Sequence, residues 1–321
     1  MADLLLQPQF RQLVFTNTNA ILMSSETNIT IWECTRGEVR GMCAGRLLGV
    51  ARDGQTLLTQ ELPYQFRAYR STDGQAIGLP AVQQYDLDQR CAVYGTAQRA
   101  GVRAALHVVD ALGGAEPIAI PLSLSRGEWI DNWALAPGVP YLFYTVSGEA
   151  EGHDWANGQV IDLRSCERVQ FGQHPFFAVS RFLSPMPLAF SAEHHLMISS
   201  HQNRFDIYQL PGGQHLKKLL IGDGGGDVVA FHPQHAWLLA INIEPIQQRD
   251  REKRAVALID TRQEQREQQE QRRLMLPLAE RIVALAISPD GQYIAARLKQ
   301  GMLVVWSAER GELCWAANDP S

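Results

Sequence analysis

The sequence predicts an all-β fold, a β-propeller of seven blades, each a four-stranded antiparallel sheet. Short apolar runs separated by turn residues recur along the whole 321-residue chain. The third run of each unit ends in an aromatic or β-branched residue, and the intervals between these ends, 37 to 52 residues, are near the length of one propeller blade or slightly above it. They are Trp32, Tyr69, Val109, Ile161, Tyr208, Ile259 and Trp306. No interval holds a further unit, so residues 1–321 are predicted to form one seven-bladed domain.

Each unit begins with a turn followed by a short apolar run. The turns are rich in residues that tolerate tight backbone geometry, and they lie at 15–20, 51–55, 86–89, 136–140, 191–195, 232–235 and 288–292. The runs that follow lie at 21–23, 56–58, 91–94, 141–144, 196–198, 237–240 and 293–296. Short, continuously apolar runs are typical of strands buried between neighbouring sheets, so these are the predicted second strands.

The last unit carries the repeat pattern most clearly. Its first turn reads Ser288-Pro289-Asp290-Gly291, and its third strand ends at Trp306. In these residues, and in the repeat along essentially the whole chain, the sequence resembles the WD40 family of β-propellers. No Gly-His dipeptide opens a repeat and no strict Trp-Asp pair occurs. Packing is therefore expected to carry more of the stability than the His–Asp network that the family has inside each blade.

The resemblance implies a non-catalytic scaffold that presents loops to one or more protein partners, as a subunit or adaptor of a complex, with no cofactor. The alternative is a propeller enzyme, a hydrolase or lyase, or a ligand sensor, with a metal or carboxylate site at the central channel. The sequence lacks a Gly-x-Ser-x-Gly elbow, a His-Glu-x-x-His helix and a dinucleotide-binding fingerprint. These absences favour the non-enzymatic interpretation.

Composition narrows the classes of partner. With 45% hydrophobic and 20% charged residues the chain is an ordinary globular one. A formal net charge of −5 gives no global attraction to nucleic acid or to anionic lipid. No apolar run reaches the roughly 18 residues of a membrane span, and residues 1–7 do not resemble a signal peptide. A cytoplasmic location is expected, with the five scattered cysteines reduced.

A recognition surface is predicted on one face, the top face, where loops join second to third strands and one blade to the next. Aromatic and Arg residues dominate protein interfaces, and several lie in these loops. The candidates are Arg99, Arg103, Trp129, Trp155, His174, Phe176, Phe177 and Arg204. Plugging of the blade ends is the alternative role for these aromatic residues.

Histidines in two consecutive first turns are the weak candidate for a metal site. His194 and His195 lie in the fifth unit, and His232 and His235 lie in the sixth, with Glu193 as a further ligand. Imidazoles so placed suit zinc or copper, but their spacing matches no ligand pattern. Solvated turn histidines are therefore the favoured interpretation, and no metal is predicted.

Two further segments carry predictions. Residues 263–273 mix Gln, Glu and Arg without apolar periodicity, which predicts a solvated loop on the face opposite the top. The first and last units each contain four strands of their own. The ring is therefore expected to close in one of two ways: residues 4–6 add an edge strand to the last blade, or the end blades meet by packing alone.

Overall fold

The computed structural model describes most of the chain as β-strands joined by turns. The described residues are 13–25, 27–51, 53–62, 65–79, 91–96, 105–110, 116–122, 124–125, 128–135, 140–150, 153–169, 179–180, 187–191, 194–201, 204–220, 225–232, 235, 237–243, 254–262, 270–277 and 280–320. Every regular element among them is a strand. No helix in these ranges is long and apolar enough to cross a membrane.

The first three sheets come from the N-terminal part of the chain. The first contains β1 (Leu13–Phe15), β2 (Ala20–Ser24), β3 (Asn28–Glu33) and β4 (Val39–Ala44). The second contains β5 (Arg46–Val50), β6 (Thr56–Leu62), β7 (Gln65–Arg70) and β8 (Ala76–Ile77). The third contains β9 (Cys91–Thr96), β10 (Ala105–Asp110) and β11 (Ile118–Pro121).

Four sheets follow. The fourth contains β12 (Glu128–Leu135), β13 (Tyr141–Ala150), β14 (His153–Asp162), β15 (Glu167–Arg168) and β16 (Val179–Ser180). The fifth contains β17 (Pro187–Ser191), β18 (Leu196–His201), β19 (Arg204–Gln209) and β20 (Gln214–Leu220). The sixth contains β21 (Gly225–Phe231), β22 (Leu238–Ile243), β23 (Ala255–Asp260) and β24 (Glu270–Met275). The last contains β25 (Ile282–Ile287), β26 (Tyr293–Leu298), β27 (Met302–Ser307) and β28 (Leu313–Asn318).

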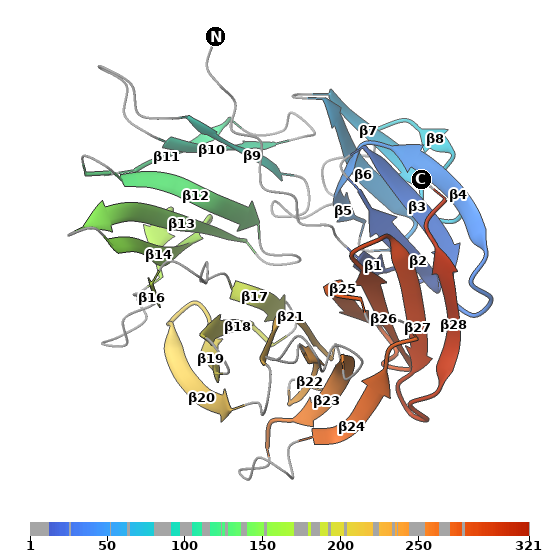
Figure 1. Cartoon of the computed structure of the whole chain (residues 1–321). Coiled ribbons are helices and arrows are strands. Elements are labelled where there is room, and N and C mark those ends of the chain that lie inside the picture. Colours follow the sequence, from blue (N-terminus) through green and yellow to red (C-terminus); the bar gives the residue numbers. More distant parts are fainter. Residues whose placement is uncertain are drawn as a thin grey trace.

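The sheets are arranged around a common centre, as in a β-propeller (Figure 1). Strands adjacent in sequence pair antiparallel within each sheet, and β4, β20, β24 and β28 lie on the outside. The predicted all-β propeller is confirmed. The prediction that every blade has four strands was wrong. Among the described strands, one sheet has three strands. Another has five, because β14 also pairs with β16.

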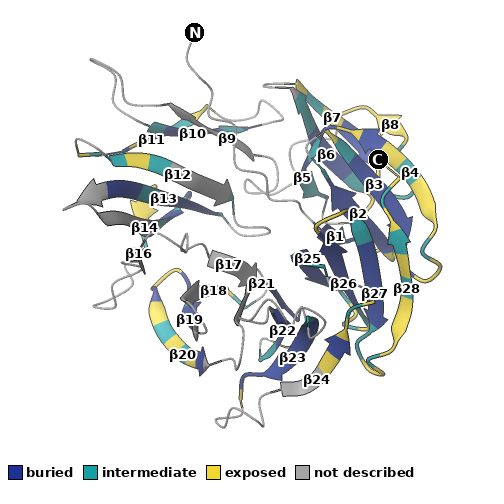
Figure 2. Cartoon of the chain, in the orientation of Figure 1, coloured by how far each residue is buried: buried dark blue, intermediate teal, exposed yellow. Residues whose placement is uncertain are grey.

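The hydrophobic core lies between the sheets rather than within them. Six clusters of buried side chains in the described residues each draw on two neighbouring sheets. Buried residues, dark blue in Figure 2, dominate inner strands such as β3 and β26, whereas the outer strands β4 and β28 are mostly exposed. A single sheet cannot cover both of its faces, so each sheet depends on its neighbours.

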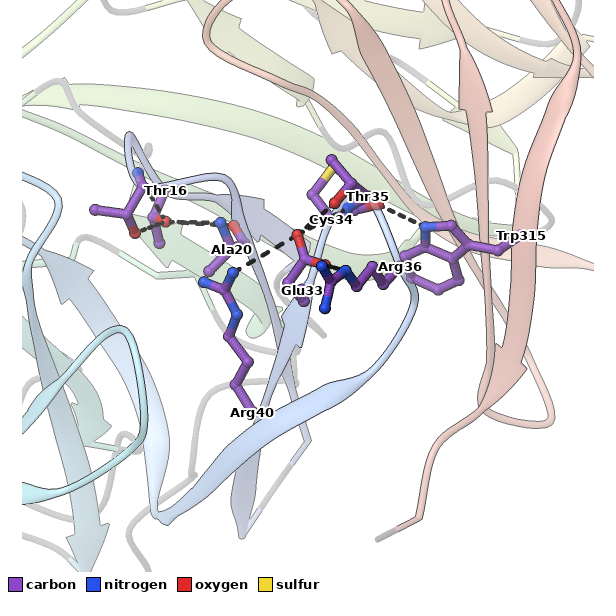
Figure 3. A network of polar contacts seen from close by, with 9 residues as sticks. Thr16, Ala20, Glu33, Cys34, Thr35, Arg36, Arg40 and Trp315 are labelled. Atoms are coloured by element: carbon purple, nitrogen blue, oxygen red, sulfur yellow. Dashed lines mark hydrogen bonds and ion pairs between the residues drawn. The ribbon is translucent and has the colours of Figure 1, made fainter.

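An aromatic contact joins the first sheet to the last. The Trp315 ring of β28 stacks on Trp32 of β3 with 5.8 Å between centroids. The Trp315 indole N–H donates to the Cys34 carbonyl over 2.5 Å (Figure 3). Gly37 has a φ of +69°, and a Cβ there would lie 2.6 Å from the Trp315 ring. Glycine is therefore required both by backbone geometry and by the close approach of the indole.

The turn that carries Cys34 is fixed by a carboxylate. Glu33 accepts hydrogen bonds from the Thr35 amide (3.1 Å) and the Thr35 hydroxyl (2.7 Å). The hydroxyl bond holds the pKa of Glu33 below its usual value, and nearby Arg40 acts in the same direction. This network (Figure 3) presents the Cys34 carbonyl to Trp315.

A polar contact joins the same two sheets nearer the top face. Arg297 of β26, 5% exposed, donates to the Ser24 carbonyl over 2.8 Å and lies 3.8 Å from the Asp319 carboxylate. Asp319 in turn accepts from the Thr30 hydroxyl over 2.9 Å. In the described ranges β28 pairs with β27 and β1 pairs with β2, so side chains make the observed junction. Residues 4–6, the alternative closing strand, lie outside the described residues.

Two predicted loops are partly strands. The first is the segment 147–155, which contains Trp155 and was predicted to be a top-face loop. It is mostly paired, because β13 and β14 continue as a hairpin up to the pair Ala150–His153. Residues 270–273, predicted as solvated loop, belong to β24 and pair with β23. In both segments backbone pairing with an existing neighbour strand outweighs the polar composition.

Trp306 is 1% exposed, and its indole N–H donates to the Met275 carbonyl of the neighbouring sheet over 3.2 Å. Trp306→Ala should cost about 3 to 5 kcal/mol in the free energy of unfolding, because it leaves a cavity between two sheets. Denaturant unfolding measures this loss. Leu313→Ala, at an exposed position, is the control and should change stability by less than about 0.5 kcal/mol. A Trp306→Ala loss below about 1 kcal/mol contradicts a core role.

Trp315→Phe should keep the ring stack on Trp32 and lose the hydrogen bond to the Cys34 carbonyl. The expected cost is about 0.5 to 1.5 kcal/mol in the free energy of unfolding, the net worth of one such bond. Trp315→Ala should cost more, because the stack is lost as well. If urea unfolding shows both variants as stable as the parent protein, the end sheets do not depend on this contact.

Candidate functional site

The face opposite the top carries the turns between first and second strands and between third and fourth strands. We call it the bottom face. Antiparallel pairing brings both kinds of turn of one sheet to the same end. In the sixth sheet, the turn before β22 contains His232, His235 and Trp237, and the turn after β23 contains Arg262. The Thr261 amide donates to the Trp237 carbonyl over 2.7 Å and ties the two turns together.

Four planar side chains stack in order across these turns. The His232 and His235 rings are 4.7 Å apart, and the His235 and Trp237 rings are 4.9 Å apart, both near parallel. The Arg262 guanidinium carbon lies 3.5 Å from the Trp237 ring centroid. This geometry suits cation–π attraction. We call these four residues the ladder.

A buried carboxylate orients the exposed end of the ladder. Asp260 accepts from the Arg262 Nε (3.0 Å), Nη2 (2.7 Å) and backbone amide (2.9 Å). The Asp260 side chain is 2% exposed, whereas that of Arg262 is 60% exposed. The Arg262 hydrogen bonds, with a smaller contribution from Lys217, hold the pKa of Asp260 below its usual value. Such a bidentate pair fixes the plane of the guanidinium as well as its position.

The buried end of the ladder rests on the last sheet. A Cβ at Gly291 would lie 2.2 Å from the His232 Nε2, so the ring occupies space that only glycine leaves open. Gly291 belongs to the Ser-Pro-Asp-Gly turn, in which Ser288 Oγ donates to Asp290 over 2.6 Å. Burial and the neighbouring His235 lower the pKa of His232, while Asp290 opposes them.

A related arrangement occurs in the fourth sheet. Arg164 donates through Nε (2.9 Å) and Nη2 (2.6 Å) to Asp162 and lies over the Tyr141 ring at 5.6 Å. Its Nη2 also reaches the Tyr141 hydroxyl at 3.1 Å. Tyr141 is the first residue of β13 and pairs with Asp162, whereas Trp237 lies one residue before β22, so the two sites are related but differ by one position in register. No histidine stack accompanies Tyr141 in the described residues.

Three of the eight predicted top-face residues lie in the described part of the chain. Trp129 lies in β12 and is 47% exposed. Trp155 was predicted in a loop but lies in β14, paired with Gly148 and Ser180. Arg204 is the first residue of β19 and pairs with His201 and Leu220. The remaining candidates, Arg99, Arg103, His174, Phe176 and Phe177, lie outside the described residues.

The predicted histidine turns lie on the bottom face, as expected from the strand order. His195 has a φ of +51° in the turn before β18, and His232 and His235 stack with each other. Among the residues that are described, no group of three or more His, Cys, Asp or Glu side chains is placed to hold a metal ion. Glu193, the proposed further ligand, lies outside them.

The sequence contains a signal for the ladder that motif reasoning missed. Asp162-Leu163-Arg164 and Asp260-Thr261-Arg262 share the pattern Asp-x-Arg directly after a third strand. In both units an aromatic residue lies at or just before the first residue of the second strand, at Tyr141 and Trp237. A side chain two residues beyond an Asp can fold back on it, so the repeat of this pattern predicts the pair, though not the stack.

His232 should make stability depend on pH, because its pKa is lowered in the folded protein. The neutral form is favoured by folding, so this stabilisation is present above the unfolded pKa of about 6.5 and is lost as pH falls through the folded value. Denaturant unfolding between pH 7.5 and 5 should show a smaller loss for His232→Gln than for the parent protein. Equal losses in the two proteins would contradict this assignment.

Comparisons with known proteins give information about the fold alone. No protein-family model matches the chain, and no curated protein is significantly similar to it in sequence. The Cps50 (Swd1) β-propeller domain of Myceliophteria thermophila aligns with a TM-score of 0.57 and 12% identity, over 96% of this chain and 99% of that one. A chain of the mitotic checkpoint complex aligns with a TM-score of 0.57 and 14% identity, over 95% and 89%.

A third similar structure is the dihydro-heme d1 dehydrogenase NirN in complex with DHE. It aligns with a TM-score of 0.50 and 18% identity, over 97% of this chain and 66% of that one, so this chain spans about two thirds of its length. At these identities the comparisons establish a shared architecture and no shared chemistry. The β-propeller architecture that the resemblance implied is thereby confirmed.

Proposed function

We propose that this chain is a non-catalytic interaction scaffold, a subunit or adaptor that binds a protein partner through the ladder on its bottom face. The observation that carries the proposal is the exposed Arg262 held on Trp237 by a buried Asp260. Trp and Arg are the residues that most often supply binding energy at interfaces. A side chain already fixed in place loses little conformational freedom on binding.

The architecture supports this role. The described strands form seven sheets, and we infer that each is one blade of a seven-bladed ring within a single domain. A rigid ring keeps bottom-face turns from different blades in fixed relation. One similar structure belongs to a multiprotein assembly, the mitotic checkpoint complex, and we extend that mode of action to this chain. A cytoplasmic location and the absence of a nucleic-acid or membrane partner remain part of the proposal.

The top face is a second proposed contact area. Among the described residues, Trp129 is the contact that we propose on this face, because its side chain is exposed. Aromatic side chains on that face would act as further anchors. The two faces are separable by mutation, since the ladder and Trp129 lie at opposite ends of their sheets.

Affinity purification from native lysate with the purified chain as bait tests the proposal. The variant carrying Trp237→Ala and Arg262→Ala should lose the partner by at least about tenfold, the loss of about 1.4 kcal/mol or more expected of one true anchor. Leu313→Ala, exposed on the outer strand β28, is the matched control and should retain it. Trp129→Ala reports the top face separately.

Thermal melting of each variant confirms that it is folded. A partner that is retained by the ladder variant and lost from Trp129→Ala would move the interface to the top face. No protein enriched over a bait-free control would contradict the scaffold function.

A further inference from the structure

We propose that the ladder binds a carboxylate-bearing segment of the partner protein, an acidic peptide stretch with an aromatic or aliphatic side chain beside the acid. This inference rests on the proposed function and names the chemistry of the partner. It follows from the hydrogen-bond donors, the charge and the apolar surface that the ladder presents.

Arg262 has donors left over after its internal pairing. Its Nε and Nη2 donate to Asp260, while its Nη1 donates to none of the described residues. A guanidinium has five N–H groups in a rigid fork, so the edge formed by Nη1 and Nη2 remains for an external acceptor. The side chain is 60% exposed, and this edge is held by the bond to Asp260 and by the stack on Trp237.

Two cations lie beside Asp260 at the exposed end of the ladder. Lys217 of β20 reaches across from the fifth sheet and donates to the Thr261 carbonyl. Its charge also helps to lower the pKa of Asp260. Arg262 and Lys217 thus place positive charge on this part of a chain whose formal charge is −5. A carboxylate is attracted to such a point, and a basic segment is repelled.

The aromatic part of the ladder selects a peptide over a bare anion. Trp237 is partly exposed between Arg262 and His235, and His235 is exposed. An acid held by Arg262 therefore has the exposed part of the Trp237 indole next to it, against which a neighbouring partner side chain can pack. Contacts of both kinds in one place give specificity that a single charge does not.

The related Asp-x-Arg site in the fourth sheet is an internal control. Arg164 has the same pairing with Asp162, but its Nη2 is also engaged by the Tyr141 hydroxyl. Its aromatic neighbour is at 5.6 Å rather than 3.5 Å. The described contacts of Arg164 include no lysine ammonium. Arg164 should therefore contribute little to binding of the same peptide.

The experiment uses two terminally blocked, fluorescein-labelled peptides, (Trp-Glu-Glu)3 and (Trp-Gln-Gln)3, with the purified full chain and fluorescence anisotropy as readout. The acidic peptide should bind at least about tenfold more tightly than the amide peptide, which corresponds to about 1.4 kcal/mol. Arg262→Gln should reduce the affinity for the acidic peptide to that of the amide peptide. Lys217→Gln should weaken it, and Arg164→Gln should leave it within about twofold.

A second variant guards against loss of fold. Arg262→Gln leaves the buried Asp260 with one cation fewer, which is destabilising. The double variant Asp260→Asn and Arg262→Gln removes both charges. It should melt near the parent temperature and still fail to bind. Lys217→Gln leaves the ladder intact, so its weaker binding reports charge rather than stacking.

Several outcomes would overturn the proposal. Equal affinity for the two peptides would contradict the carboxylate preference. A loss of affinity in Arg164→Gln as large as that in Arg262→Gln would contradict the placement of the site at the ladder. Displacement of the acidic peptide by inorganic phosphate at a lower concentration than by glutarate would assign the site to phosphate. Glu264→Gln with Glu267→Gln raising affinity about tenfold would identify the chain's own carboxylates as the occupants.

Failure of the acidic-peptide proposal can be distinguished from failure of the scaffold proposal. If the amide peptide binds as well as the acidic one, while the ladder variant still loses its captured partner, the scaffold function stands and the acidic chemistry is wrong. If partner capture is unaffected by the ladder variant, the scaffold surface itself is misplaced.

Discussion

The junction between the first and last sheets is the constraint on which the rest of the structure depends. Each of these sheets is built from strands that are consecutive in sequence, so in the described residues no strand of one end belongs to the sheet of the other. The junction contains an apolar cluster between the two sheets, with the Trp315 stack and hydrogen bond on one side and Arg297 and Asp319 on the other. Repeat units are stable through the faces that their neighbours cover. A junction that opened would therefore expose two apolar faces at once.

The last sheet connects this junction to the ladder. Trp315 and Arg297 are its contacts with the first sheet, and Gly291 is its contact with His232 of the sixth. The first turn of the sheet holds Gly291 in place through Ser288 and Asp290. The buried end of the ladder thus rests on a sheet that is packed on both sides. This packing holds the buried His232 ring, and the exposed and half-exposed side chains stacked on it therefore form a fixed surface.

Strand positions could be predicted from the sequence because they depend on local patterns. The apolar runs that became β2, β6, β22 and β26 satisfy the period and the turn chemistry by themselves, and Trp306 is buried where its position at the end of a third strand suggested. The ends of strands depend instead on what lies beside them. Trp155 was misplaced because the hairpin of β13 and β14 continues past the expected loop. The ladder joins two turns and a neighbouring sheet, so neither the stack nor the approach of Gly291 to His232 has a signature in any one segment.

A comparison of the two Asp-x-Arg turns distinguishes the residues that the fold requires from those that it does not. In both, the aspartate accepts the backbone amide two residues on at 2.9 Å, which shapes the turn after the third strand. The fourth sheet forms this turn with a tyrosine at 5.6 Å and without a histidine stack. An ion pair whose cation is exposed contributes little to stability. The turn therefore accounts for Asp260 and for Arg262 as its partner. It does not account for Trp237 at 3.5 Å, the two histidine rings stacked beyond it, or the lysine that reaches in from the neighbouring sheet. These additions orient the exposed guanidinium and place a second cation near it, as the proposed recognition of an acidic partner segment requires.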